Sequence, residues 1–203
     1  MPDCPTPPVT PFDQLLAEVR ACRVCADRLP QGPRPVLRAQ PSCRLLIIGQ
    51  APGSKVHETG IPWDDESGRR LRDWLALAPP QFYDDRQIAI IPTGLCYPGR
   101  DAKGGDRPPR PECAPLWHPL LLPHLKNLGL TLLVGGYAHQ QALGARAAGG
   151  VSVVVRRWRD FLPEFLVLPH PSWRTRHWQT ANPWFDQELL PEARRLIAGL
   201  GLT

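Results

Sequence analysis

The sequence of 203 residues has no long hydrophobic run, and no stretch approaches the roughly 18 consecutive apolar residues that a membrane-spanning helix requires. Residues 1–12 have neither a basic start nor an apolar core, so they do not predict a secretory signal peptide. Three enzyme motifs are also missing, namely G-x-S-x-G, G-x-x-x-x-G-K-[ST] and G-x-G-x-x-G. These absences favour a cytoplasmic protein and weigh against an α/β-hydrolase or a nucleotide-binding enzyme.

Lysine is scarce as well, and nearly all of the basic residues are arginine. Basic residues exceed acidic ones by 5, and the arginine fork suits phosphate oxygens. A genome rich in G and C produces the same excess, so the charge alone is weak evidence for nucleic-acid binding. The 6 cysteines say more, because in a reducing compartment cysteines serve metal sites or catalysis more often than disulfides.

The spacing of apolar residues predicts an α/β fold. Residues 12–19 are apolar at helical spacing, and a closing helix is expected over about 186–200. Short runs that are apolar on consecutive residues suit strands buried on both faces, and they occur at 45–48, 88–91, 130–134, 151–155 and 165–168. Helical patterns lie between them at 67–77, 114–128 and 137–147. This alternation predicts a three-layer sandwich with a mainly parallel central sheet of about four to five strands.

The chain is expected to form one domain over residues 12–203, preceded by an irregular, proline-rich tail over residues 1–11. In folds of this class, ligands bind where loops leave the carboxyl ends of the strands. Three segments therefore meet in one crevice, and they are Gly49-QAPG, Pro92-TGLC and Pro169-HPSW.

Four of the cysteines form a candidate metal site. Cys22 and Cys25 make a C-x-x-C pair at the end of the first predicted helix, and Cys96 and Cys113 flank a loop that contains four prolines. Thiolates in this arrangement favour zinc or an iron–sulfur cluster. The alternative is four small buried apolar residues, since free cysteine packs well in cores. The two other cysteines, at positions 4 and 43, fit neither pair.

The ordered set of motifs resembles the uracil-DNA glycosylase superfamily over about residues 12–195, and it is most similar to the family 4 group, which carries a four-iron, four-sulfur cluster. The matching pieces are Cys22-RV-Cys25, Leu45-LIIGQAPG, Thr59-GIPW, Cys96-YPG, Pro111-E-Cys113 and Leu168-PHPS. The resemblance implies that the four paired cysteines hold such a cluster in a structural role. It also implies a DNA partner and removal of a flipped base.

The resemblance further assigns roles in base recognition. Trp63 stands where the family stacks an aromatic ring on uracil, and His170 stands where an imidazole donates to the base carbonyl. Gln50, Ala51 and Gly53 are expected to shape the first loop and supply backbone donors. Ser172 and Thr93 are further candidates for the substrate site. Ordinary core roles for the tryptophan and the histidine are the alternatives.

Two departures from the family pattern bear on catalysis. Gln50 replaces the usual glutamate, and Val56 stands at a later acidic position. Glu58, Asp64 and Asp65 are candidates to position water or stabilise charge in their place, and the alternative is that they are solvated loop acids. The second strand loop carries Thr93 in place of the asparagine that reads uracil in many relatives. Uracil and other deaminated or damaged bases are therefore all open as substrates. A relative that binds DNA without cleaving it is the alternative function.

Two loops are expected to contact DNA. The loop from 96 to 113 is basic through Arg100, Lys103, Arg107 and Arg110, and the segment after His170 combines Arg174 and Arg176 with tryptophans. A tryptophan-rich cap over the core is the alternative for that segment. The 96–113 loop contains no histidine, which excludes a covalent mechanism through a histidine of this loop. A monomer is expected, because one small domain closes the whole site.

Overall fold

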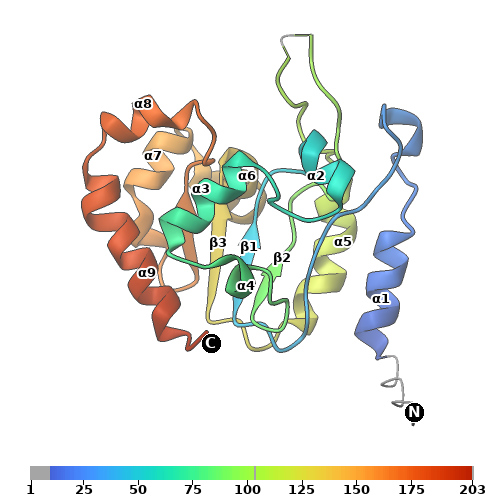
Figure 1. The fold of residues 1–203 in the computed structure, drawn as a ribbon, viewed down its shortest axis with the longest axis horizontal. Helices are drawn as coiled ribbons and strands as arrows, with labels where there is room; N and C mark the ends of the chain where they lie inside the picture. Colours follow the sequence, from blue (N-terminus) through green and yellow to red (C-terminus); the bar gives the residue numbers. More distant parts are fainter. Residues whose placement is uncertain (1–9, 103, 203) are drawn as a thin grey trace.

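The computed structural model describes residues 10–102 and 104–202, and it has the predicted α/β architecture (Figure 1). Four parallel strands form one sheet in the order β2-β1-β3-β4. The strands are β1 (Leu45–Ile48), β2 (Ile88–Ile90), β3 (Leu130–Val134) and β4 (Phe165–Leu168). Nearly every strand residue is buried, because helices cover both faces of the sheet, and this is why the strands read as unbroken apolar runs.

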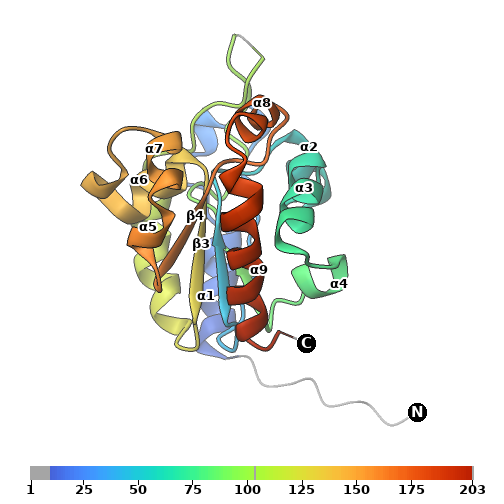
Figure 2. The ribbon, with the colours of Figure 1, turned by 90° about the vertical axis from the view of Figure 1, so that its left-hand side faces the viewer.

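Helices form the two outer layers, and Figure 2 shows the sheet between them with α5, α6 and α7 on one side and α3, α4 and α9 on the other. The longer helices are α1 (Pro11–Arg20), α3 (Glu66–Leu75), α5 (Cys113–Leu121), α6 (Gly136–Leu143) and α9 (Leu190–Gly199). The shorter ones are α2 (Ser54–Thr59), α4 (Pro79–Phe82), α7 (Val151–Arg156) and α8 (Thr175–Thr180). Among the described residues, no helix has the length and hydropathy to cross a membrane.

The predicted strand over residues 151–155 is wrong, because this segment forms α7. Val154 and Val155 are buried and Val151 is partly buried, whereas Ser152 and Val153 face solvent. This burial has the period of a helix, since positions i, i+3 and i+4 lie on one face. A short run dominated by valine resembles a buried strand in sequence. Packing in the outer helical layer, which the sequence does not show, determines that this segment is a helix.

Prolines lie at two further differences in helix boundaries, whereas the helix predicted over 137–147 ends at Leu143 before Gly144. The helix predicted over 114–128 ends at Leu121 and gives way to a short 3₁₀ turn that contains Pro123. The closing helix begins as a π-helical turn, Phe185–Leu189, and Pro191 follows at the start of α9. Because Pro191 has no N–H to donate, the chain widens there before regular α-helix begins.

At the N-terminal end, the helix starts one residue earlier than the predicted domain boundary. Thr10 caps α1 by accepting a hydrogen bond from the Asp13 backbone at 3.2 Å, and Asp13 accepts from the Thr10 N–H at 2.9 Å. This reciprocal capping stabilises the first turn, and Pro11 is well tolerated there. The rest of the predicted tail, residues 1–9, lies outside the described residues.

Candidate active site

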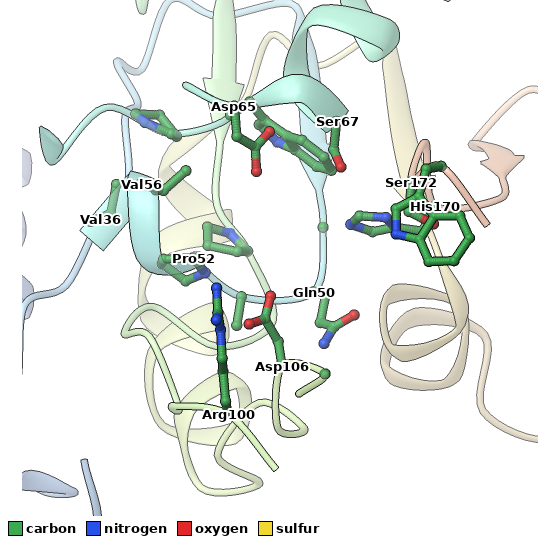
Figure 3. A pocket seen from close by; sticks show the side chains of 18 of the residues that line it. Val36, Gln50, Pro52, Val56, Asp65, Ser67, Arg100, Asp106, His170 and Ser172 are labelled. Carbon is green, nitrogen blue, oxygen red and sulfur yellow. The ribbon is translucent and has the colours of Figure 1, made fainter. Parts of the chain in front are cut away.

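A cavity of about 420 Å³ opens at the carboxyl ends of the strands, where the sequence predicts the crevice. Its walls come from the loop after β1, the segment that leads into α3, the 96–113 loop and the loop after β4 (Figure 3). Of the predicted substrate and catalytic residues, the lining includes Gln50, Ala51, Gly53, Trp63, His170 and Ser172.

Thr93 fastens two of these loops together. Its hydroxyl donates to the carbonyl of Gly49 at 2.9 Å, and its backbone N–H donates to the same oxygen at 2.9 Å. The N–H of Gly94 donates in addition to the carbonyl of Gln50 at 2.8 Å. Thr93 is buried and lies outside the cavity lining, so its hydroxyl shapes the first loop, and it does not face the space that a base would occupy.

Trp63 and His170 both line the cavity, with ring centroids 5.6 Å apart and ring planes inclined by 33°. The Trp63 indole packs against Gly49 so closely that a Cβ at Gly49 would lie 2.7 Å from the ring. Trp63 itself has a φ of 57°, in the left-handed region that bulky side chains rarely adopt. The structure thus holds this ring against the first loop in a strained backbone conformation.

His170 is held by the loop that follows it. Ser172 and Thr175 both donate to the His170 carbonyl, through a backbone N–H at 2.9 Å and through a hydroxyl at 2.5 Å. Burial lowers the pKa of the imidazole, and the nearby Asp65 carboxylate opposes this shift. The ring is therefore neutral at physiological pH and keeps one N–H to donate.

Two carboxylates enter the cavity from opposite sides, Asp65 from the start of α3 and Asp106 from the 96–113 loop (Figure 3). A Cβ at Gly53 would lie 3.9 Å from Oδ2 of Asp65 and 3.7 Å from Oδ2 of Asp106, so both oxygens lie over the first loop. The other Asp65 oxygen caps α3 by accepting from the Gly68 N–H at 2.7 Å. Burial, with Asp65 as a smaller cause, raises the pKa of Asp106.

The other predicted acids lie elsewhere. Glu58 is exposed on α2. Asp64 lies close enough to Tyr83 to affect it: burial is the main cause that raises the pKa of the Tyr83 hydroxyl, and the charge of Asp64 raises it further. Neither carboxylate lines the cavity, and Val56 does.

Asp106 was not among the residues that the sequence singled out. It reaches the cavity because the 96–113 loop folds back on itself: Arg100 and Asp106 form an antiparallel bridge. No local motif marks that geometry.

The predicted DNA-binding arginines are placed in three different environments. Arg100 and Arg174 line the mouth of the cavity, and Trp173 beside them is 70% exposed. Arg107 and Arg176 are exposed outside the lining. Arg110 lies apart from them, where it pairs with Glu112 at 3.3 Å and contacts the cysteine site. Lys103 lies outside the described residues.

Cys22, Cys25, Cys96 and Cys113 line one small cavity between the end of α1 and the start of α5. Its other walls are mainly apolar, with Leu29, Pro33, Pro35, Leu95 and Trp117. Burial raises the pKa of the Cys96 thiol to about 11 and that of Cys113 to about 12, and the Leu95 N–H donates to the Cys113 sulfur at 3.3 Å. Cys43 is fully buried in the core, away from this cavity.

Two observations bear on what this cysteine cavity would accept. Within residues 10–102 and 104–202, no three His, Cys, Asp or Glu side chains converge closely enough to hold a single metal ion. Zinc would bring its thiolates to roughly 4 Å from one another, given Zn–S bonds of about 2.3 Å. In addition, the Nε1 of Trp117 and the Nε of Arg110 line the cavity, and both are buried without a hydrogen-bond acceptor in the described structure. Acceptor atoms of a bound group would satisfy these two donors.

The comparison with known families agrees with the placement of these loops. The family model of the uracil DNA glycosylase superfamily matches residues 38–194, which is well over half of the chain. The match includes all four strands and each of the loops that line the cavity. The chain therefore belongs to the uracil DNA glycosylase superfamily.

Proposed function

We propose that this protein is a DNA glycosylase that takes uracil, or another deaminated or damaged base, out of the duplex and hydrolyses its bond to deoxyribose. The observation that carries the proposal is the convergence of an aromatic ring, a neutral imidazole and two carboxylates in one cavity at the sheet edge. A base must leave the stack before its glycosidic bond is accessible, and a cavity of this kind gives it a place to bind.

Each group suits one part of the hydrolysis. Trp63 offers a stacking surface, and the N–H of His170 donates to a base carbonyl as negative charge develops on the departing base. A water oxygen forms the new bond to C1′ while the bond to the base nitrogen breaks, and the electron pair of that bond leaves with the base. The proton that the water loses neutralises the released base.

The carboxylate needed near the sugar is proposed to come from Asp65 and Asp106. Gln50 lines the cavity at the position where a glutamate is usual in the family. Its side-chain amide can form hydrogen bonds to a substrate but carries no charge. Of the two carboxylates, Asp65 is proposed for this role, because burial favours the neutral form of Asp106. The second candidate function, a relative that binds DNA without cleaving it, is favoured by Gln50 and by Val56 in the lining.

DNA contact is proposed at the mouth of the cavity. Arg100 and Arg174 lie there, and their guanidinium groups suit backbone phosphates. Trp173, exposed beside Arg174 with the guanidinium 5.5 Å from its ring, offers a face on which a base can stack. All of these groups come from one chain, and we propose that the protein acts as a monomer in the cytoplasm.

The four cysteines are proposed to bind a four-iron, four-sulfur cluster, with zinc as the alternative. The buried N–H groups of Trp117 and Arg110 would have sulfide acceptors in such a cluster. The four cysteines would then join the segment after α1 to α5 and to the base of the 96–113 loop. The protein contributes rigidity there, and the ion pair between Arg28 and Glu112 joins the same two segments.

A panel of oligonucleotides tests this function. Duplexes and single strands that each contain one uracil, hypoxanthine or xanthine are incubated with the protein, and abasic sites are then cleaved with alkali. We expect scission at one or more of these bases, with a loss of rate of about 100-fold or more in His170→Ala and Asp65→Asn. Tight binding of every duplex without scission would establish the non-cleaving alternative.

A further inference from the structure

Two arginines of α3 each bind a backbone carbonyl in one of the loops that carry the cavity's rings. Arg72 Nη1 donates to the Trp63 carbonyl oxygen at 3.2 Å and to the Tyr83 hydroxyl oxygen at 3.0 Å. The Tyr83 hydroxyl in turn donates to the same Trp63 carbonyl at 3.3 Å. Two donors therefore converge on one peptide oxygen.

This carbonyl belongs to the one cavity-lining residue, other than glycine, that has a positive φ in the described chain. At a φ of 57°, Trp63 has a conformation that persists only when its surroundings impose it. The first turn of α3 closes the remaining side: a Cβ at Gly68 would lie 1.7 Å from the Trp63 oxygen. Arg72, Tyr83 and Gly68 together fix the direction in which the indole leaves the backbone.

Arg70 acts on the opposite loop. Its Nη1 donates to the Ser172 carbonyl at 2.6 Å, and its Nη2 binds the side-chain oxygen of Gln179 on α8. The guanidinium also lies 4.9 Å from the Trp74 ring centre, which limits its movement. Ser172 is bonded through its own N–H to the carbonyl of His170, so Arg70 holds the segment that places the imidazole.

We propose that Arg70 and Arg72 are positioning residues that set the relation between Trp63 and His170 and thereby the productive pose of the flipped base. This inference rests on the glycosylase function proposed above. Residues two apart on a helix leave it in nearly opposite directions, so a single rigid helix reaches both loops at once. Misplacement of a reacting group by 1 Å costs on the order of 100-fold in rate, so this arrangement has a kinetic consequence.

The test compares variants that differ in which end of α3 they disturb. Arg72→Met and Arg70→Met remove the two loop contacts, and Arg72→Lys keeps a charged donor for the Trp63 oxygen. Arg194→Met is the matched control: Arg194 donates to the Trp74 carbonyl at 2.9 Å and the Asp73 carbonyl at 3.2 Å, at the far end of the same helix. Arg69→Met controls for charge, because Arg69 is exposed and pairs only with Glu66 in the described structure.

Two measurements are made on each variant. Single-turnover cleavage at saturating protein gives the rate of base removal, and binding to a duplex with an abasic-site analogue gives affinity separately. We expect Arg72→Met and Arg70→Met to lower the rate about 10- to 100-fold with less than threefold change in affinity. Arg72→Lys should recover part of the rate, whereas Arg194→Met should lower the unfolding temperature and leave the rate near wild type.

The position of the His170 ring is followed independently of activity by its proton NMR signals, assigned with His170→Gln. Because the Trp63 ring lies 5.6 Å away, its ring current shifts these signals, and both methionine variants should move them. Unmoved signals, or rates that fall only as far as in Arg194→Met, would overturn the positioning role. If the wild type cleaves no base yet the signals move in both variants, the positioning of the rings stands and the glycosylase function fails.

Discussion

Replacement of Gly68 by alanine is the substitution that disturbs the cavity most directly through the backbone. The added Cβ would lie 1.7 Å from the Trp63 carbonyl oxygen, and contacts between real Cβ atoms and their neighbours essentially never fall below 3.0 Å. The oxygen must therefore move by about 1.3 Å or more from the position in which it accepts from Arg72 and Tyr83. Because the obstacle is backbone, no flexible side chain can absorb the clash.

The expected effect on Gly68→Ala has two parts. Overpacking of this kind costs about 1–3 kcal/mol of unfolding free energy, and the Asp65 cap on the same N–H adds to the loss if the turn shifts. Because the indole belongs to the same residue, we expect it to shift as well, with a rate loss of up to about 100-fold. Urea unfolding measures the first part, and single-turnover base release measures the second.

Gly199→Ala is the matched control, because a Cβ there meets no atom within 4 Å and the position is helical. Alanine at such a site leaves stability unchanged or raises it by about 0.5–1 kcal/mol. A Gly68→Ala protein as stable and as fast as Gly199→Ala would refute the reasoning, since the close approach of α3 to Trp63 would then have no consequence.

Three further substitutions or titrations follow from the same contacts. Gly49→Ala places a Cβ 2.7 Å from the Trp63 ring. We therefore expect base release to be about tenfold slower and the unfolding free energy to fall by only about 1 kcal/mol, as measured by the same two assays. An unchanged rate would mean that the indole does not contact the base. Burial lowers the pKa of His170, so the NMR signals of its ring should stay unchanged as the pH falls through the ordinary histidine pKa of about 6.5 and shift only below it; a titration centred at that value would show an exposed imidazole. The Cys96→Ser and Cys113→Ser proteins should each lose bound iron, acid-labile sulfide and visible colour. The Cys43→Ala protein should keep them, because Cys43 is buried away from the cysteine cavity. A colourless wild-type protein that contains only zinc would contradict the proposed cluster.

The buried histidines also make stability depend on pH. Burial lowers the pKa values of His118, His139 and His170, so below about pH 6.5 the unfolded chain binds more protons than the folded one. Unfolding free energy should therefore fall as the pH decreases through and below that value. Urea midpoints measured at several pH values check the direction of this change.

The sheet and the crevice follow from the sequence because their causes are local. The runs at 45–48 and 130–134 are apolar on consecutive residues, which suits strands covered on both faces, and the loops after such strands meet at one edge. The segment at 151–155 does not follow, since three inward valines on a helix have the same composition as a buried strand.

Within the site, the type of a residue does not show which groups its side chain contacts in the folded protein. Thr93 has a hydroxyl that suits base recognition, yet the chain turns it to the Gly49 carbonyl. Asp106 looks like one more loop acid, and only the folding back of the 96–113 loop brings it opposite Asp65. The roles of Arg70 and Arg72 depend on which carbonyls pass beside α3, which is a property of the tertiary fold.

The central claim is that the cavity removes an intact base from DNA, and mass analysis of both products tests it directly. After incubation of the protein with duplexes that each contain one uracil, hypoxanthine or xanthine, we expect a free base in solution and an equal amount of strand that has lost that base and gained the elements of water. Asp65→Asn and His170→Ala should yield little of either product. Stable binding with neither product from any of these duplexes would contradict the claim.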